Sequence, residues 1–282
     1  MAAATSSRKP ASPAKYQVLE HQEHVLTRPG MYLGSTDTVE QDGYFVTTDD
    51  DDAGLRLAPE TVSHVPAVAC MLNELLCNAA DNKQRELEDG VPAAKAVTKD
   101  VHLTLGEDGS VCVRNNGPTV PLTPLGKPPF EDVPTPAVVF GMLLSGTNFD
   151  DSEERTTGGC NGLGSKLTNI FSTKFEVKIC DGSGKEGTFT WTRNMSEKPQ
   201  DVPVRLRKGG KRSFTQVTFW PDLDRFGLDA LPPGFRAVAR RRLLDLAACA
   251  QLRVHLVVVR LRRLDQRLGG VELVGLARRR RG

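Results

Sequence analysis

A glycine-rich segment near the middle of the chain has the composition of a phosphate-binding loop. Residues 157–166 read Thr-Gly-Gly-Cys-Asn-Gly-Leu-Gly-Ser-Lys, with four glycines in seven positions. Glycine lets backbone NH groups approach an anion closely, and a helix that follows would add its positive end. Lys166 would supply a full charge to the terminal phosphates. Alone, the segment is equally consistent with a flexible linker.

The spacing of this segment does not match two common phosphate-binding loops. A Walker A loop needs Gly-Lys followed by Ser or Thr, whereas Ser165 here separates Gly164 from Lys166. A dinucleotide-binding fingerprint follows a strand in a βαβ unit, and no such unit precedes these glycines. A different nucleotide site is therefore the one to consider.

Glu74 and Asn78 stand one helical turn apart in a segment with helical hydrophobic spacing. The buried stripe of that helix begins near residue 65, and Glu74 and Asn78 fall on its opposite side together with Asp81, Asn82 and Arg85. A carboxylate beside an amide oxygen suits water activation next to a Mg²⁺ ion that bridges phosphates. The alternative is an ordinary solvated helix face.

The elements around these residues predict an α+β fold, a two-layer sandwich of a mainly antiparallel sheet with helices on one face. A proline-rich loop is expected over 118–136, with a strand before it and a helix after it. The expected helices cover residues 64–85, 137–144, 167–171 and 233–251. The expected strands cover residues 101–105, 111–114, 175–180, 187–193, 213–220 and 252–259.

Composition limits the functional classes. The 282 residues are 39% hydrophobic and 26% charged, which is usual for a globular protein, and no apolar stretch would span a membrane. Six cysteines without a CxxC pair argue against a zinc ribbon or a disulfide framework. Residues 236–282 hold 13 arginines and three acidic residues, a net +10, so the C-terminal part is the basic one.

Five sequence segments together resemble the eukaryotic-type type IIA DNA topoisomerases. Three of them match the nucleotide motifs of that family: Glu-Leu-Leu-Cys-Asn-Ala-Ala-Asp-Asn-Lys-Gln-Arg at 74–85, Asn-Asn-Gly at 115–117 and the glycine-rich 157–166. Residues 28–35 and 166–175 are also similar, and the likeness runs over about 16–256. The family belongs to the ATPase superfamily of gyrase, heat-shock chaperones, histidine kinases and mismatch-repair proteins, so it implies a Bergerat-type ATP-binding fold.

The resemblance implies a role for each matching residue, with ATP and Mg²⁺ as cofactors. Glu74 would be the base that activates water, Lys166 the catalytic cation, and Asn78 the Mg²⁺ ligand and phosphate contact. Asn115, with Asn116 beside it, would recognise adenine, although these two residues could simply make a turn. The remaining expected nucleotide contacts are Gly146, Thr147, Asn148, Gly159, Cys160, Asn161, Gly162, Leu163, Gly164 and Ser165.

Three departures from the family pattern predict weaker nucleotide binding. Pro118 follows Gly117 where the family has a Gly-x-Gly, Cys160 replaces an arginine, and Leu163 replaces a tyrosine. Cys160→Arg would restore a fixed cation near the phosphates, so we expect it to tighten binding. Titrating an ATP analogue against both chains measures this, and equal affinities would count against it.

The resemblance also implies a domain plan and partners. A disordered tail is expected at 1–15, the ATP-binding domain at 16–232, the start of an incomplete transducer domain at 233–259 and an Arg-rich tail at 260–282. The family implies a homodimer, DNA as partner through the full-length enzyme, no membrane, and the nucleus. The Arg-rich tail could contact DNA phosphates or be a non-native terminus.

Two other readings stay open. The chain could be a catalytically degenerate nucleotide-binding module or a truncated product without DNA cleavage activity, because the transducer lysine has no counterpart within it. It could also be another superfamily member, such as a histidine kinase or chaperone. Two sequence motifs favour the topoisomerase family over these relatives. They are Asn-Ala-Ala-Asp-Asn-Lys-Gln-Arg at 78–85 and Lys-Leu-Thr-Asn-Ile-Phe-Ser at 166–172.

Overall fold

The computed structural model describes residues 18–48, 55–93, 95–143, 145, 163–198, 205–206 and 211–258. The expected tails at 1–15 and 260–282 lie outside these residues. Within them, no helix is both long and apolar enough to cross a membrane.

A seven-stranded sheet forms one layer of the molecule, in the order β7-β6-β5-β8-β4-β3-β9. All neighbouring strands are antiparallel except β3 and β9, which are parallel. The strands are β3 (Asp100–Leu105), β4 (Val111–Asn116), β5 (Ser172–Cys180), β6 (Lys185–Thr192), β7 (Arg205–Leu206), β8 (Phe214–Pro221) and β9 (Arg253–Val258). The mainly antiparallel sheet predicted from the sequence is confirmed.

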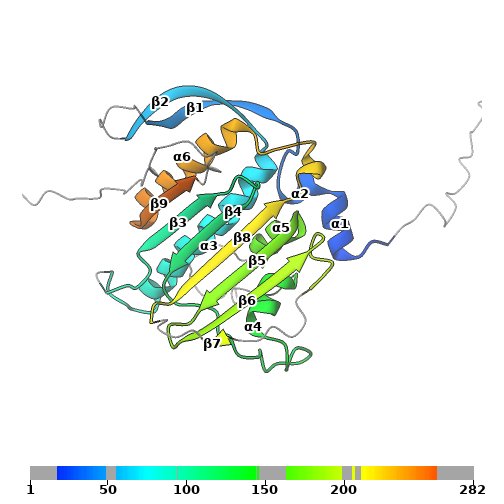
Figure 1. Ribbon diagram of the computed structural model, residues 1–282, viewed down its shortest axis with the longest axis vertical. Coiled ribbons are helices and arrows are strands. Elements are labelled where there is room, and N and C mark those ends of the chain that lie inside the picture. Colours follow the sequence, from blue (N-terminus) through cyan, green and yellow to red (C-terminus); the bar gives the residue numbers. More distant parts are fainter. Residues whose placement is uncertain are drawn as a thin grey trace, which may run out of the picture.

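Helices cover one face of this sheet and lie behind it in Figure 1. The helices are α1 (His21–Thr27), α2 (Pro29–Tyr32), α3 (Pro66–Glu88), α4 (Thr135–Gly141), α5 (Gly164–Ile170) and α6 (Pro233–Ala250), with a 3₁₀ turn, η2, at Leu223–Phe226. Alternate residues of each central strand are buried against them, as in β3, where Val101 and Leu103 are fully buried while His102 is only half-buried. The two-layer α+β sandwich is therefore as expected.

Helix α3 is the central helix because its apolar stripe is long and continuous. Met71 and Leu72 are fully buried, and Leu75, Leu76 and Ala79 continue the same stripe into the core. Pro66 stands in the first turn, where its missing NH costs no helical hydrogen bond. The opposite side of α3 is thereby left for the site.

A two-stranded sheet, which the sequence did not predict, lies outside the main layers. Strands β1 (Val39–Thr48) and β2 (Leu55–His64) pair antiparallel and lie across α6 (Figure 1). Phe45 and Val62 pack with Ala69 of α3 and Val238 of α6 in a small apolar cluster. This cluster holds the hairpin against the helices.

The described part of the segment from 233 onward, up to Val258, packs against the main layers. Strand β9 pairs with β3, so that Val254 lies opposite Val101 in the same sheet. Lys83 of α3 donates from Nζ to the carbonyls of Ala250 and Gln251, each at 2.8 Å, and so caps the end of α6. Residues up to Val258 are thus built into this fold.

Candidate functional site

A cavity of about 460 Å³ opens between α3, strands β4 and β8, and the start of α5. It brings together predicted residues from three distant segments of the chain. Those on its wall are Glu74, Asn78, Asn115, Leu163, Gly164, Ser165 and Lys166. Its size is that of a small-molecule or cofactor site. The convergence that the sequence predicted is therefore present in the structure.

Glu74 is half-buried on the cavity wall, and its surroundings favour the protonated form. Burial raises the pKa of its carboxyl above the ordinary value, and the nearby Asp81 raises it further. A carboxylate whose pKa moves toward neutral pH is a better proton acceptor at that pH. Glu74 thus has the environment of a general base.

Gly164 approaches Glu74 so closely that a larger residue would not fit without moving the carboxylate. A Cβ built on Gly164 would lie 2.3 Å from Oε2 of Glu74. The first residue of α5 is therefore in contact with the carboxylate of α3. Glycine at this position is required by that approach.

Substituting alanine for Gly164 should damage catalysis more than stability. The obstructing atom is the end of a flexible side chain, and alanine gains about 1 kcal/mol of helix propensity over glycine, so we expect little loss of stability. A carboxylate displaced by about 1 Å should lower the ATP hydrolysis that the family resemblance implies by about 100-fold. Phosphate release and thermal unfolding measure the two effects. Gly30→Ala, where nothing lies within 4 Å, is the control, and unchanged hydrolysis in Gly164→Ala would refute the expectation.

Lys166 is almost fully buried, with 4% of its surface exposed, and its Nζ donates to the carbonyl of Ser145. Burial lowers the pKa of its ammonium to about 8. The cavity therefore holds a desolvated cation whose partner is a neutral carbonyl. A phosphate oxygen would satisfy this cation better than the carbonyl does.

The two adjacent asparagines of β4 point to opposite faces of the sheet. Asn115 is buried, with 8% exposed, and lines the cavity. On the other face, the Oδ1 of Asn116 accepts from the NH groups of Lys99 and Asp100, each at 2.9 Å, and its Nδ2 donates to the carbonyl of Val97 at 2.9 Å. Because side chains alternate along a strand, only one of the pair can reach the site. The structure does not bring Asn116 to the cavity with the other predicted residues.

The turn after Asn116 is shaped by Gly117 and held by Asn82 of α3. Gly117 has φ +117°, and a Cβ there would lie 2.0 Å from Oγ1 of Thr98. Asn82 donates from Nδ2 to the carbonyl of Pro118 at 3.0 Å. Proline's missing NH therefore leaves this contact intact, because the carbonyl makes it.

Among the described residues of the cavity wall, carboxylates outnumber cations. Glu74, Asp81, Glu86 and Asp89 line it, against Arg85 and Lys166. Glu86 is occupied, since its carboxylate accepts from the NH groups of Val97 at 2.7 Å and Thr98 at 2.8 Å. Burial raises the pKa of Glu86, but the side-chain hydrogen bond with Thr98, the backbone hydrogen bonds from Val97 and Thr98 and the charge of Lys83 together lower it below the ordinary value. A polyphosphate in such a cavity would need a cation beside Glu74 and Asn78, whose oxygens are the ligand type Mg²⁺ prefers.

Two groups of residues differ from the expected set of nucleotide contacts. The first group was expected but lies outside the described residues, and the second lines the cavity without having been expected. Gly146, Thr147, Asn148, Gly159, Cys160, Asn161 and Gly162 belong to the first group. In the second, Thr215 and Val217 of β8 line the cavity because β8 pairs with β4, with Thr215 opposite Asn115. The alternation of side chains within 213–220 could have shown that Thr215 and Val217 share one face of the strand. The sequence alone does not show that this strand pairs with β4.

His21 and His24 both lie in the first helix, α1. His24 contacts the hydroxyl of Tyr32 through Nδ1 at 2.9 Å. Over the parts of the chain that are described, no group of three or more His, Cys, Asp and Glu side chains is placed to hold a metal ion.

Comparison with known proteins places this geometry in a family, although no family model matches the chain. The chain is 36% identical to DNA topoisomerase 2 of Saccharomyces cerevisiae over 242 residues, or 85% of its length. It is 39% identical to DNA topoisomerase 2-alpha of Gallus gallus over 233 residues, or 82%. The structure matches the ATPase region of the S. cerevisiae enzyme with a TM-score of 0.74 over 88% of the chain, at 33% identity.

The chain is related to the ATPase region of eukaryotic DNA topoisomerase II. The ATPase and transducer domains of topoisomerase II from Balamuthia mandrillaris match with a TM-score of 0.76, at 34% identity over 87% of the chain. The ATPase domain of Thermus thermophilus gyrase B, at 22% identity and a TM-score of 0.56, shares the fold. The resemblance inferred from the sequence is thus confirmed.

The matched part is a small share of the topoisomerase II relatives. The chain spans 16% of the S. cerevisiae enzyme and 14% of the G. gallus enzyme. It covers 61% of the solved S. cerevisiae ATPase region. Statements about whole topoisomerases therefore concern much more than this chain.

Proposed function

We propose that this chain binds ATP in the cavity between α3, β4 and α5 and hydrolyses it, as the ATP-driven part of a type II DNA topoisomerase. One observation carries the proposal: Glu74, Asn78, Asn115 and Lys166, from three separate segments, line one cavity of about 460 Å³. A general base, an oxygen ligand, a polar group for a base edge and a cation are what ATP hydrolysis requires.

The adenine is proposed to lie against β4 and β8. The carboxamide of Asn115 would hydrogen-bond the polar edge of the base. Asn115 is buried, and a buried polar group is costly when it lacks a hydrogen-bond partner. Val113 and Val217, also on the wall, would contact the apolar ring faces. Asn116 has no part in this arrangement.

The triphosphate is proposed to extend toward α5. Lys166 would exchange the Ser145 carbonyl for a phosphate oxygen. Asn78 would hold Mg²⁺, which would supply positive charge that offsets the charge of the phosphates. Further phosphate and ribose contacts are proposed for Gly146, Thr147, Asn148 and residues 159–162, as the family resemblance implies.

Glu74 is proposed to act on the attacking water. Its carboxylate would accept the proton as the water oxygen forms a bond to the γ-phosphorus. The bond between that phosphorus and the β–γ bridging oxygen breaks, so ADP and phosphate leave. Lys166 would stabilise the charge that develops on the transferred group.

The wider setting follows the topoisomerase relatives. We propose that ATP binding closes a homodimer, that the full-length enzyme passes DNA duplexes, and that it works in the nucleus. A second candidate is a module that binds ATP without hydrolysing it. Cys160 stands where the family has an arginine, and Leu163 where it has a tyrosine. Both replacements favour weak nucleotide binding, and they are the sequence features that support this second candidate.

Two measurements on one preparation test the proposal. Calorimetric titration with Mg²⁺ and a non-hydrolysable ATP analogue should show one site per chain, and Mg²⁺-dependent phosphate release should follow with ATP. Binding without release would favour the second candidate. Absence of both binding and release, in a chain that is folded by circular dichroism, would refute the proposal.

A further inference from the structure

A left-handed turn of three consecutive residues follows strand β6. Arg193, Asn194 and Met195 have φ values of 51°, 58° and 64°. Residues other than glycine adopt this conformation at a cost, and asparagine tolerates it best. The buried side chain of Met195, 2% exposed, helps to fix the turn. A costly conformation persists where surrounding contacts determine it, and such places often serve function.

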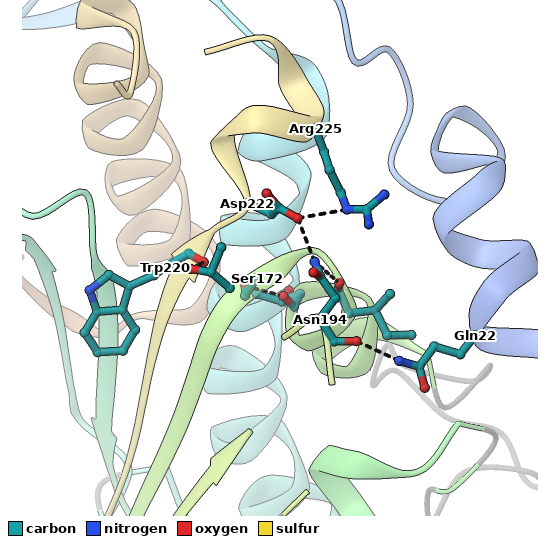
Figure 2. Close-up of polar contacts among 9 residues, drawn as sticks. Gln22, Ser172, Asn194, Trp220, Asp222 and Arg225 are labelled. Carbon is teal, nitrogen blue, oxygen red and sulfur yellow. Dashed lines mark hydrogen bonds and ion pairs between the residues drawn. The ribbon is translucent and has the colours of Figure 1, made fainter. Parts of the chain in front are cut away.

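Asn194 makes four hydrogen bonds to four segments of the chain (Figure 2). Its Nδ2 donates to the carbonyl of Ile170 and to Oδ2 of Asp222, each at 2.9 Å. Its backbone NH donates to the carbonyl of Ser172 at 3.1 Å. Its carbonyl accepts from Nε2 of Gln22, in α1, at 2.6 Å. One residue therefore joins α1, the end of α5, the start of β5 and the approach to η2.

These contacts hold the C-terminal end of α5, whose last carbonyls lack helical partners. Asn194 satisfies the carbonyl of Ile170, and the NH of Asp222 donates to that of Phe171 at 2.9 Å. Asp222 is fixed in turn by Nε of Arg225, 2.8 Å from its Oδ2. A helix of seven residues is too short to be stable by itself, so such external contacts decide where it lies.

The same short helix carries the cation of the cavity. Lys166 lies one turn before Ile170 in α5, roughly 6 Å along the axis. Further along the helix, Oγ1 of Thr168 donates to the carbonyl of Met71 in α3 at 3.1 Å, and Nδ2 of Asn169 donates to that of Phe140 at 3.0 Å. Because Lys166 and Ile170 belong to the same short helix, a shift of the C-terminal end of α5 would move Lys166 relative to Glu74.

We infer that Asn194 is a positioning residue, which fixes α5 so that Lys166 reaches the cavity and which ties the position of α5 to helix α1 through Gln22. This inference rests on the proposed nucleotide site. Because coupling between sites is reciprocal, nucleotide in the cavity should also stabilise the docking of α1. Asn194 itself lies outside the cavity wall.

Three variants separate the side chain from the backbone turn. Asn194→Gly keeps the left-handed conformation and removes the carboxamide. Arg193→Gly is the matched control, since it relaxes the same turn at a residue whose side chain is 80% exposed. Gln22→Ala removes the donor from α1 and leaves the turn unchanged. Each is titrated calorimetrically with Mg²⁺ and an ATP analogue between pH 7 and 9.

Losing the side-chain bonds of Asn194 should weaken nucleotide binding about five- to tenfold, and losing the Gln22 bond about threefold. Arg193→Gly should stay within about twofold of the original chain. In Asn194→Gly the pH at which affinity falls should also rise, because a displaced Lys166 is better hydrated. A residue that only stabilises the fold would not move this midpoint.

Amide hydrogen exchange of the nucleotide-free chain gives a readout that does not depend on the proposed function. Residues 164–170 should exchange faster in both Asn194→Gly and Gln22→Ala than in Arg193→Gly. Equal exchange and equal affinity in all three would overturn the inference. If the original chain binds no nucleotide, the proposed function fails, and exchange alone decides the positioning role. Should Asn194→Gly not fold, Gln22→Ala decides between the same outcomes.

Discussion

Replacing Glu74 with glutamine should abolish ATP hydrolysis while ATP still binds. Glutamine keeps the shape of the side chain in contact with Gly164 but cannot accept a proton from water. The loss expected for a missing general base is about 10²–10⁴-fold in phosphate release. Binding of an ATP analogue should remain within a few-fold, because the phosphate contacts come from other residues. Phosphate release and calorimetric titration measure the two quantities.

The pH dependence of hydrolysis provides an internal check on this role. Burial, and then Asp81, raise the pKa of Glu74, so activity should rise with pH through a value above that of an ordinary carboxyl. Asp81→Asn removes the neighbouring charge and should move that rise to lower pH. Glu107→Gln, at an exposed position between β3 and β4, should change neither rate nor profile. Full hydrolysis by Glu74→Gln would exclude Glu74 as the base.

Replacing Lys166 with methionine should weaken ATP binding about 10- to 100-fold, since a charge-assisted hydrogen bond to phosphate is lost. Methionine fills most of the volume of the buried lysine, so the fold should persist. The effect should be greatest below pH 8, where the lysine of the original chain is charged. Calorimetric titration with Mg²⁺ and an ATP analogue measures it.

The pH profile of binding distinguishes Lys166 from other cations. Burial lowers its pKa to about 8, so the free chain loses this charge as pH rises through that value. Affinity should therefore be highest below pH 8 and fall above it, while Lys166→Met should lack this fall. Lys127→Met, at an exposed position of the proline-rich loop, should behave as the original chain. An unchanged profile in Lys166→Met would contradict the assignment.

Local patterns in the sequence were enough to predict the central helix and the side of it that faces the cavity. The apolar stripe of α3 fixes which side is buried, and so places Glu74 and Asn78 on the open side. The resemblance to topoisomerases supplied the link between α3, Asn115 and Lys166. Spacing alone would not have joined segments so far apart along the chain.

Features set by long-range pairing were not predictable in the same way. The parallel pairing of β9 with β3 brings residues 253–258 into the sheet beside residues 100–105. No local sequence pattern predicts this pairing. The assignment of Asn116 as a partner of Asn115 overlooked strand alternation, which turns the two side chains apart. The left-handed turn at Asn194 was not predicted, because an asparagine without a neighbouring glycine is only a weak indication of such a turn.

The most direct test of the nucleotide site is a crystal structure of this chain with Mg²⁺ and a non-hydrolysable ATP analogue. We expect the adenine beside Asn115, the phosphates within hydrogen-bond distance of Nζ of Lys166, and a water near the γ-phosphate in contact with Glu74. A nucleotide bound elsewhere, with the space between α3, β4 and α5 empty, would contradict the proposed ATP site.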